Sequence, residues 1–187
     1  MKTAEIRRRL QAATGSEHLV RIDQTSKPGD RESGFVLAVG RKWVLLASTR
    51  DGGFFDGYAA IRITDVRRVR DDTSFESRAT RLRAEWPPSF PRPLTEVDLD
   101  TTAGVLRSMA MPTGLIGIES TRRRNAMWIG ALHSLTRHWV YLHEVRSDAT
   151  WHDVPLGYRL GKVTTVYTDS QYQRGLLAIA GTPPEID

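Results

Sequence analysis

The sequence predicts a mainly β protein (α+β) made of two tandem copies of one fold: a helix, five short strands forming a small bent barrel, and a closing helix. Three observations predict it. Between Gly34 and Arg70, short apolar runs rich in β-branched and aromatic residues alternate with glycines, a pattern that disfavours a helix. A similar stretch begins at Gly130. An offset of 96 residues aligns the chain with itself without a gap for more than forty positions, including Gly34 on Gly130.

The offset also aligns the most distinctive residues. Trp43 falls on Trp139, and, after one extra residue in the second copy, an offset of 97 places Arg62 on Arg159. Chance similarity between apolar runs does not explain a constant offset that carries both residue types, and two copies are too few for a solenoid. The expected organisation is a first copy over 1–86, a Pro-rich linker over 87–97 and a second copy over 98–187.

Local patterns define the elements of the first copy. Ile6, Leu10 and Ala13 share one helix face, and the segment from residue 18 to 24 alternates apolar and polar residues as a half-buried strand does. The expected elements are a helix over 3–13, a strand over 18–24, a loop over 26–33, a hairpin of strands 35–39 and 43–47, two strands within 58–69, and a helix over 75–86 with Phe75, Ala79 and Leu82 facing the core.

The second copy repeats this plan after the stiff segment over 87–93, where four prolines prevent a helix. The expected elements are a helix over 103–111, a strand over 115–120, a loop over 121–125, a hairpin of strands 127–135 and 139–145, a longer loop over 146–157, strands within 158–167, and a closing helix over 171–180.

Composition limits the function classes. The net charge is +5 and the pI about 9.9, with 23 arginines among 27 basic residues. Arginine richness favours anion binding, but a GC-rich genome explains it equally well, and 22 acidic residues are mixed with the basic ones. The absence of cysteine excludes disulfides and thiolate chemistry. Without a signal peptide or an apolar run near the roughly 18 residues of a membrane span, a cytoplasmic protein is expected.

The motif Arg62-Ile63-x-x-Val66-x-x-Val69, repeated from Arg159, resembles the closing strand pair of Sm-like proteins, which are small barrels of the SH3 type. The resemblance implies an Sm-like barrel in each copy and an RNA site near the arginine. The tryptophan strand followed by this arginine strand also resembles the WYL module of bacterial regulators. The Asp and Asn that Sm proteins carry in the hairpin between strands two and three are absent here.

Basic residues at two hairpin tips and one loop are the candidate nucleic-acid-binding residues. Turn arginines and lysines contact phosphates readily, and matched positive tips would make a repeated anion contact. A solvated loop is the alternative for any single basic run. The candidates are Arg41 and Lys42 at the first tip, Arg137 at the second, and Arg122, Arg123 and Arg124 in the loop.

Other chemistry is not expected. His133 and His143 could be cross-strand neighbours, but two histidines without a third ligand make a poor zinc site, so we expect no metal and no cofactor. No serine has a nucleophile signature. Trp43 and Trp139 are expected to anchor the core rather than stack on bases.

We therefore expect a non-catalytic binding module that holds nucleic acid, preferably RNA, through its basic tips. One alternative is a protein-interaction or assembly module that binds a protein partner or a second copy through exposed barrel edges. Another is a WYL-like ligand-sensing domain. An enzyme is not expected.

Overall fold

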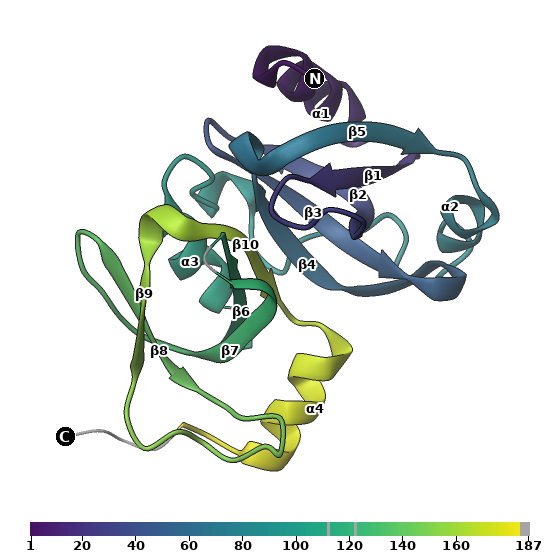
Figure 1. The fold of residues 1–187 in the computed structure, drawn as a ribbon. Helices are drawn as coiled ribbons and strands as arrows, with labels where there is room; N and C mark the ends of the chain where they lie inside the picture. Colours follow the sequence, from purple (N-terminus) through teal and green to yellow (C-terminus); the bar gives the residue numbers. More distant parts are fainter. Residues whose placement is uncertain (112, 122, 184–187) are drawn as a thin grey trace.

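The computed structural model describes residues 1–111, 113–121 and 123–183. Figure 1 shows two compact bodies, one above the other, each built around strongly bent strands. Within the described ranges the chain forms four α-helices and one ten-stranded antiparallel sheet, which confirms the expected mainly β class. The helices are α1 (Thr3–Ala13), α2 (Phe75–Thr80), α3 (Thr102–Ala110) and α4 (Gln171–Ala180).

The ten strands lie in the order β5-β1-β2-β3-β4-β10-β6-β7-β8-β9. The order repeats itself, because β5-β1-β2-β3-β4 is followed by five strands in the same relative order. The strands are β1 (Leu19–Gln24), β2 (Arg31–Val39), β3 (Trp43–Arg50), β4 (Phe54–Arg62), β5 (Val66–Asp72), β6 (Leu115–Ser120), β7 (Arg123–Leu135), β8 (Trp139–Glu144), β9 (Leu156–Arg159) and β10 (Val163–Thr168).

We call β1–β5 with α1 and α2 the first half, and β6–β10 with α3 and α4 the second half. Strand registers agree between them: Trp43 pairs with Arg62 across β3 and β4, and Trp139 pairs with Arg159 across β8 and β9. The ladders of the described residues do not join β4 to β5 or β9 to β10, so the sheet is open. Its two edges are β5 and β9.

The halves meet where β4 of the first half pairs with β10 of the second, with Ala60 opposite Val166. This pairing creates a shared core. Side chains from both halves and from the linker form one buried cluster, which includes Trp43, Leu45, Phe90, Val97, Leu99, Val105, Val163 and Val166. The linker is therefore part of the core at the junction, although its prolines predicted only a stiff spacer. A second cluster, led by Leu10 of α1, fills the first half.

The expectation for α2 was wrong in length and in orientation. The helix ends at Thr80, and Phe75 and Leu82, expected in the core, are 69% and 88% exposed. Its buried face carries Ser77 and Thr80 instead. Small side chains suit this position because the helix approaches the turn at Gly53, where a Cβ would lie 2.7 Å from Thr80 Oγ1.

Two strands begin earlier than the apolar pattern indicated. β2 starts at Arg31 and β7 at Arg123, inside segments predicted to be loops. In β2 the added residues are polar and pair with β1, with Arg31 opposite Asp23. A ladder held by backbone hydrogen bonds and ion pairs leaves no apolar signal in the sequence.

Candidate functional site

The first predicted tip, between β2 and β3, is covered by Leu99 and Asp100, which follow the linker and precede α3. The Arg41 amide donates to Asp100 Oδ1 at 2.6 Å, and the Arg41 guanidinium lies 3.9 Å from the same carboxylate. The Lys42 amide donates to the carbonyl of Leu99. Gly40 makes this approach possible, because a Cβ there would lie 2.3 Å from the Leu99 Cβ. The tip and the segment before α3 thus pack together, and Arg41 already has a carboxylate, that of Asp100.

The second tip, between β7 and β8, has the same turn but different surroundings. The Thr136 amide donates to the carbonyl of Trp139 at 2.9 Å, as the Gly40 amide does to Trp43 at 2.8 Å. Arg137 is exposed, and within the described residues its side chain has no acidic or hydrogen-bonding partner. The two tips are therefore equivalent in backbone but not in charge environment.

The predicted basic loop is only partly described. Arg122 lies outside the described residues. Arg123 and Arg124 begin β7, so they belong to a strand rather than a loop, and their side chains lie outside the described part. The structure places the Arg123 backbone opposite Ser120 of β6.

Half of the arginines whose side chains are described form ion pairs with carboxylates. Asp23 alone receives ion pairs from Arg31, Arg67 and Arg70. Pairing removes much of the positive field that a polyanion would feel. Within the described residues, the arginines in ion pairs are Arg8, Arg9, Arg21, Arg31, Arg41, Arg67, Arg70, Arg81, Arg92 and Arg174.

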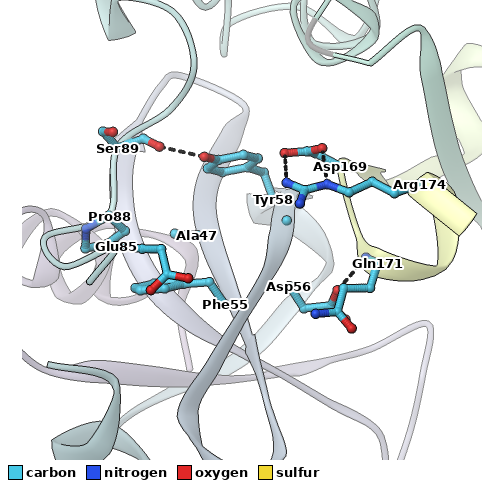
Figure 2. Close-up of a pocket in the computed structure, with 11 residues that line it drawn as sticks. Ala47, Phe55, Asp56, Tyr58, Glu85, Pro88, Ser89, Asp169, Gln171 and Arg174 are labelled. Atoms are coloured by element: carbon cyan, nitrogen blue, oxygen red, sulfur yellow. Dashed lines mark hydrogen bonds and ion pairs between the residues drawn. The ribbon is translucent and has the colours of Figure 1, made fainter. Parts of the chain in front are cut away.

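A cavity of about 350 Å³ lies where β4, the linker and the start of α4 meet. Tyr58 stands at its centre: its hydroxyl donates to the Ser89 carbonyl at 2.6 Å, and burial followed by the charge of Asp169 raises its pKa. On the other side of the Tyr58 ring, Arg174 donates two hydrogen bonds of 2.7 Å to the Asp169 carboxylate (Figure 2). The volume is at the lower end for a small-molecule site.

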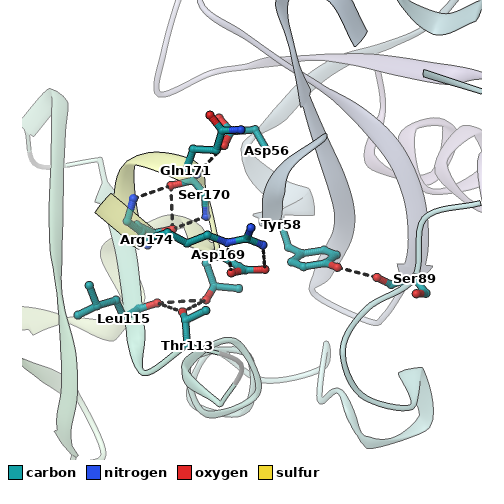
Figure 3. A network of polar contacts seen from close by, with 11 residues as sticks. Asp56, Tyr58, Ser89, Thr113, Leu115, Asp169, Ser170, Gln171 and Arg174 are labelled. Atoms are coloured by element: carbon teal, nitrogen blue, oxygen red, sulfur yellow. Dashed lines mark hydrogen bonds and ion pairs between the residues drawn. The ribbon is translucent and has the colours of Figure 1, made fainter. Parts of the chain in front are cut away.

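The polar groups around this cavity serve mainly to hold the two halves together. Asp56 of β4 accepts the backbone amide of Gln171 at 2.7 Å, at the first turn of α4 (Figure 3). Ser170 caps the same helix: its Oγ accepts from the Gln173 amide, and the Gln173 Oε1 accepts from the Ser170 amide. The Asp56–Gln171 contact therefore ties the first half to α4.

A buried polar cluster fills another part of the junction. Lys27 of the first half forms an ion pair with Glu119 of the second and lies 3.9 Å from Glu32. The Tyr167 hydroxyl is 2.5 Å from Glu32 and 3.1 Å from Glu119. Burial raises the pKa of Glu32 and raises the pKa of Tyr167 well above its usual range. The Tyr167 hydroxyl therefore lies between a carboxylate of the first half and one of the second, beside the Lys27 ammonium.

Arg62, at the end of β4, secures the strand pair between the halves. Its Nε donates to the Val163 carbonyl at 2.7 Å, and its Nη2 to the Leu160 carbonyl at 3.0 Å. The guanidinium lies over the Trp43 ring, 4.8 Å from its centroid. Burial lowers the pKa of Arg62. Through these carbonyls Arg62 reaches across the junction to the second half.

The counterpart of Arg62 in the second half is exposed. Arg159 lies over the Trp139 ring at 5.1 Å, which repeats the geometry of the first half, but within the described chain it has no hydrogen bond or ion pair. Beside it is a groove of about 430 Å³ along β9, lined by Trp128, Trp139, Glu144 and Tyr158. Trp139 is half-buried here, whereas Trp43 is 0% exposed. The expectation of a buried core anchor thus held for Trp43 alone.

The surface of the second half around this groove corresponds to the surface of the first half on which β10 packs. By the two offsets, Trp139 corresponds to Trp43 and Gly157 to Ala60, which pairs with Val166 of β10. In the first half this surface is covered by β10 and the linker. In the second half, β9 is the last strand of the sheet and its outer edge has no strand neighbour among the described residues. We call β9 and its groove the β9 edge.

Neither a metal centre nor a membrane span is found in the described part of the chain. The described residues contain no group of three or more His, Asp or Glu side chains placed to hold a metal ion. Of the candidate histidines, His143 is buried and its Nε2 donates to the His152 carbonyl at 2.6 Å. No described helix is long and apolar enough to cross a membrane.

Comparison with protein-family models, with curated proteins and with solved structures found no significant match. The site must therefore be interpreted from its own geometry. Sequence reasoning aligned Arg62 with Arg159 but did not identify the β9 edge. The sequence signal for this edge was the repeat itself, because its offset aligns Arg62, which lies at the junction, with Arg159, which is exposed.

Proposed function

We propose that this protein is a non-catalytic interaction module of two Sm-like small barrels, and that it binds a partner strand at the β9 edge. The observation that carries the proposal is the pairing of β4 with β10, because the equivalent surface of the first half already binds a strand. Adding an extended strand to a sheet edge is a common mode of protein recognition, in which backbone hydrogen bonds supply affinity and side-chain pockets supply specificity.

The side chains at the β9 edge suit this role. The Arg159 guanidinium makes no hydrogen bond within the described chain. Its equivalent, Arg62, donates to carbonyls at the start of β10 and just before it. The aromatic rings of Trp128, Trp139 and Tyr158 provide apolar walls with a polar rim. Aromatic and arginine side chains are the residues that most often dominate protein interfaces.

The test uses a synthetic peptide of residues 160–169, which contains β10 and the Leu160 carbonyl that Arg62 contacts, as a probe strand. We expect saturable binding that changes tryptophan fluorescence and slows amide exchange in residues 156–159. The Arg159→Ala substitution should weaken binding by roughly tenfold, because charged hydrogen bonds to the strand carbonyls are lost. Arg137→Ala is the matched control, since that arginine is equally exposed but lies at the hairpin tip. Absence of binding, or equal weakening by both substitutions, would contradict the proposal.

A second candidate function is nucleic-acid binding at the tip between β7 and β8. The observation that favours it is the exposed Arg137, which has no acidic partner among the described residues, next to the exposed His138. Titration of labelled single-stranded RNA at several salt concentrations tests it. Each phosphate contact contributes about 0.7 to the slope of log affinity against log salt for a single strand. Replacing Arg137 should reduce that slope more than replacing Arg41, whose charge is already paired with Asp100.

A further inference from the structure

We propose that the outer face of α2 is a docking site for an acidic amphipathic helix of a partner protein. The site is a groove of about 470 Å³, which we call the α2 groove and which is lined by Phe75, Arg78, Ala79, Leu82 and Arg83. α2 lies at the outer side of the first half, apart from β9 (Figure 1). The α2 groove shares no residue with the β9 edge, so this inference goes beyond the proposed function and does not depend on it.

α2 packs on the sheet through its polar face. Ser77 and Thr80 are buried, and the Ser77 Oγ accepts a hydrogen bond from the Leu19 amide of β1 at 3.3 Å. Thr80 lies against the turn at Gly53, on the same side of the helix. These contacts fix the rotation of the helix about its axis, and they direct its apolar face to solvent.

The outward face carries large apolar side chains at both ends of the groove. Phe75 and Leu82 are the two residues that the core-like spacing predicted to be buried, and both are mostly exposed. The second half repeats this exposure: the offset of 97 aligns them with Tyr172 and Ile179 of α4, which are 58% and 78% exposed. Core packing therefore does not account for apolar residues at these positions, and exposed apolar patches commonly mark interaction sites.

The spacing of the groove residues gives a shape that a helix can fill. Four of them stand at positions i, i+3, i+4 and i+7, which surround a hole for one side chain of a facing helix: Phe75, Arg78, Ala79 and Leu82. The backbone keeps this spacing past the end of α2, because the amides of Leu82 and Arg83 donate to carbonyls three residues earlier, both at 3.0 Å. Ala79 is the smallest of the four, so the floor of the hole is open.

The equivalent helix of the second half does not offer the same hole. Leu176 of α4 takes the place of Ala79, and it is buried in a core cluster with Leu115 and Val145. The position between the two exposed apolar side chains is therefore turned inward in α4. In α2 it holds a small residue that lines the groove.

The rim of the α2 groove is positively charged. Arg78 is exposed, and neither Arg78 nor Arg83 forms an ion pair with a carboxylate in the described part of the chain. Arg83 also lies over the Phe54 ring, 3.6 Å from its centroid, and Phe54 is itself 43% exposed. An occupant of the groove would therefore meet two arginines beside exposed aromatic rings.

The acidic residues nearest in sequence do not neutralise this rim. Glu76 is directed toward Arg21, with 3.5 Å between the charged groups, and Glu85 lines the cavity beside Tyr58. The occupant must then bring apolar side chains for the hole and carboxylates for the rim. An amphipathic helix with acidic flanks supplies both at the required spacing, as in other helix-in-groove complexes.

The test titrates the full chain into a labelled synthetic helical peptide that has leucines along one face and glutamates on both flanks. Fluorescence anisotropy should show saturable binding. Ala79→Leu fills the hole and Arg78→Glu reverses the charge of the rim, so each should weaken binding at least about tenfold. Arg107→Glu is the matched control, since Arg107 is an exposed arginine of α3 without an ion pair in the described chain, and it should bind like the wild type. Circular dichroism checks that all three variants are folded.

Two further probes define what the groove recognises. The same peptide with lysines in place of the glutamates should not bind, because its flanks would repel the arginine rim. Vesicles containing anionic lipid test a membrane surface instead, which would gain from the extra apolar side chain of Ala79→Leu rather than lose its binding site. Vesicle binding that Ala79→Leu strengthens would overturn helix docking.

Two other results would also overturn it: no binding of the acidic peptide, or equal weakening by Arg78→Glu and Arg107→Glu. The β9 edge is scored separately with the peptide of residues 160–169. Binding of that peptide should be the same for the wild type and Arg78→Glu, so failure at one surface leaves the result at the other intact.

Discussion

The two halves share an element plan and strand registers, and they differ mainly in what lies against the fourth strand. In the first half, β10 and the linker cover β4. Trp43 is therefore fully buried, and the Arg62 guanidinium donates to two carbonyls of the second half. In the second half, the equivalent strand β9 is open, Trp139 is half-buried and Arg159 is exposed. The comparison teaches that the burial of a residue here depends on the neighbouring strand and is not fixed by its place in the repeat.

The largest expected difference is between the two tryptophans. Trp43→Ala should destabilise the protein by about 3–5 kcal/mol, because it opens a cavity in the core shared by both halves and the linker. Trp139→Ala should cost only about 1–2 kcal/mol, since its side chain is already partly exposed and lies outside the shared core. Urea unfolding of both variants measures the difference. Equal losses would mean that the halves are energetically equivalent despite their different surroundings.

The arginine pair should show a smaller difference of the same sign. Arg62→Ala removes two hydrogen bonds to carbonyls across the junction and should cost about 2–3 kcal/mol. Arg159→Ala removes no hydrogen bond to a described residue and should change stability by less than about 0.5 kcal/mol. Urea unfolding of the two variants is the measurement. A large loss for Arg159→Ala would contradict an open β9 edge.

The smallest expected effect concerns the two carboxylates that contact Tyr167. Burial raises the pKa of Glu32 in the folded state, so its contribution to stability is present at low pH and is lost as pH rises through the folded pKa. Glu32→Gln mimics the protonated form, should cost little at neutral pH, and should flatten the dependence of unfolding free energy on pH in that window.

Glu119→Gln is the matched control, because it removes the carboxylate nearer to Lys27. It should cost about 1 kcal/mol or more at neutral pH, where an uncompensated lysine charge would remain in the junction. Unfolding curves measured across the acidic to neutral range compare the two variants. The assignment would be wrong if Glu32→Gln were the more destabilising of the two at neutral pH.

Local periodicity predicted much of this fold. α1, α4 and the hairpin around Trp43 lie where apolar spacing and turn residues placed them. The face of α2 was mispredicted because Phe75 and Leu82 follow a core-like spacing, while a close approach to Gly53 selects the small side chains of the opposite face.

The site was less accessible to sequence reasoning, because its contacts join distant segments. The carboxylate of Asp100 that pairs with Arg41 has no sequence signal linking it to the hairpin tip. β9 is an edge strand because β10 pairs with β4 and not with β9. The apolar spacing within these strands does not show which of them will pair. Only the repeat, through the alignment of Arg62 with Arg159, connected these regions.

The pairing of β4 with β10 also has a consequence for synthesis. The ribosome finishes β4 about a hundred residues before β10 is complete, and at about 5–20 residues per second that interval lasts several seconds or more. During that time the nascent first half presents an unpaired β4 and an uncovered Trp43 to the cell. We therefore expect the period before release of the C-terminal strand to be the stage most open to chaperone capture and to mispairing with another nascent chain.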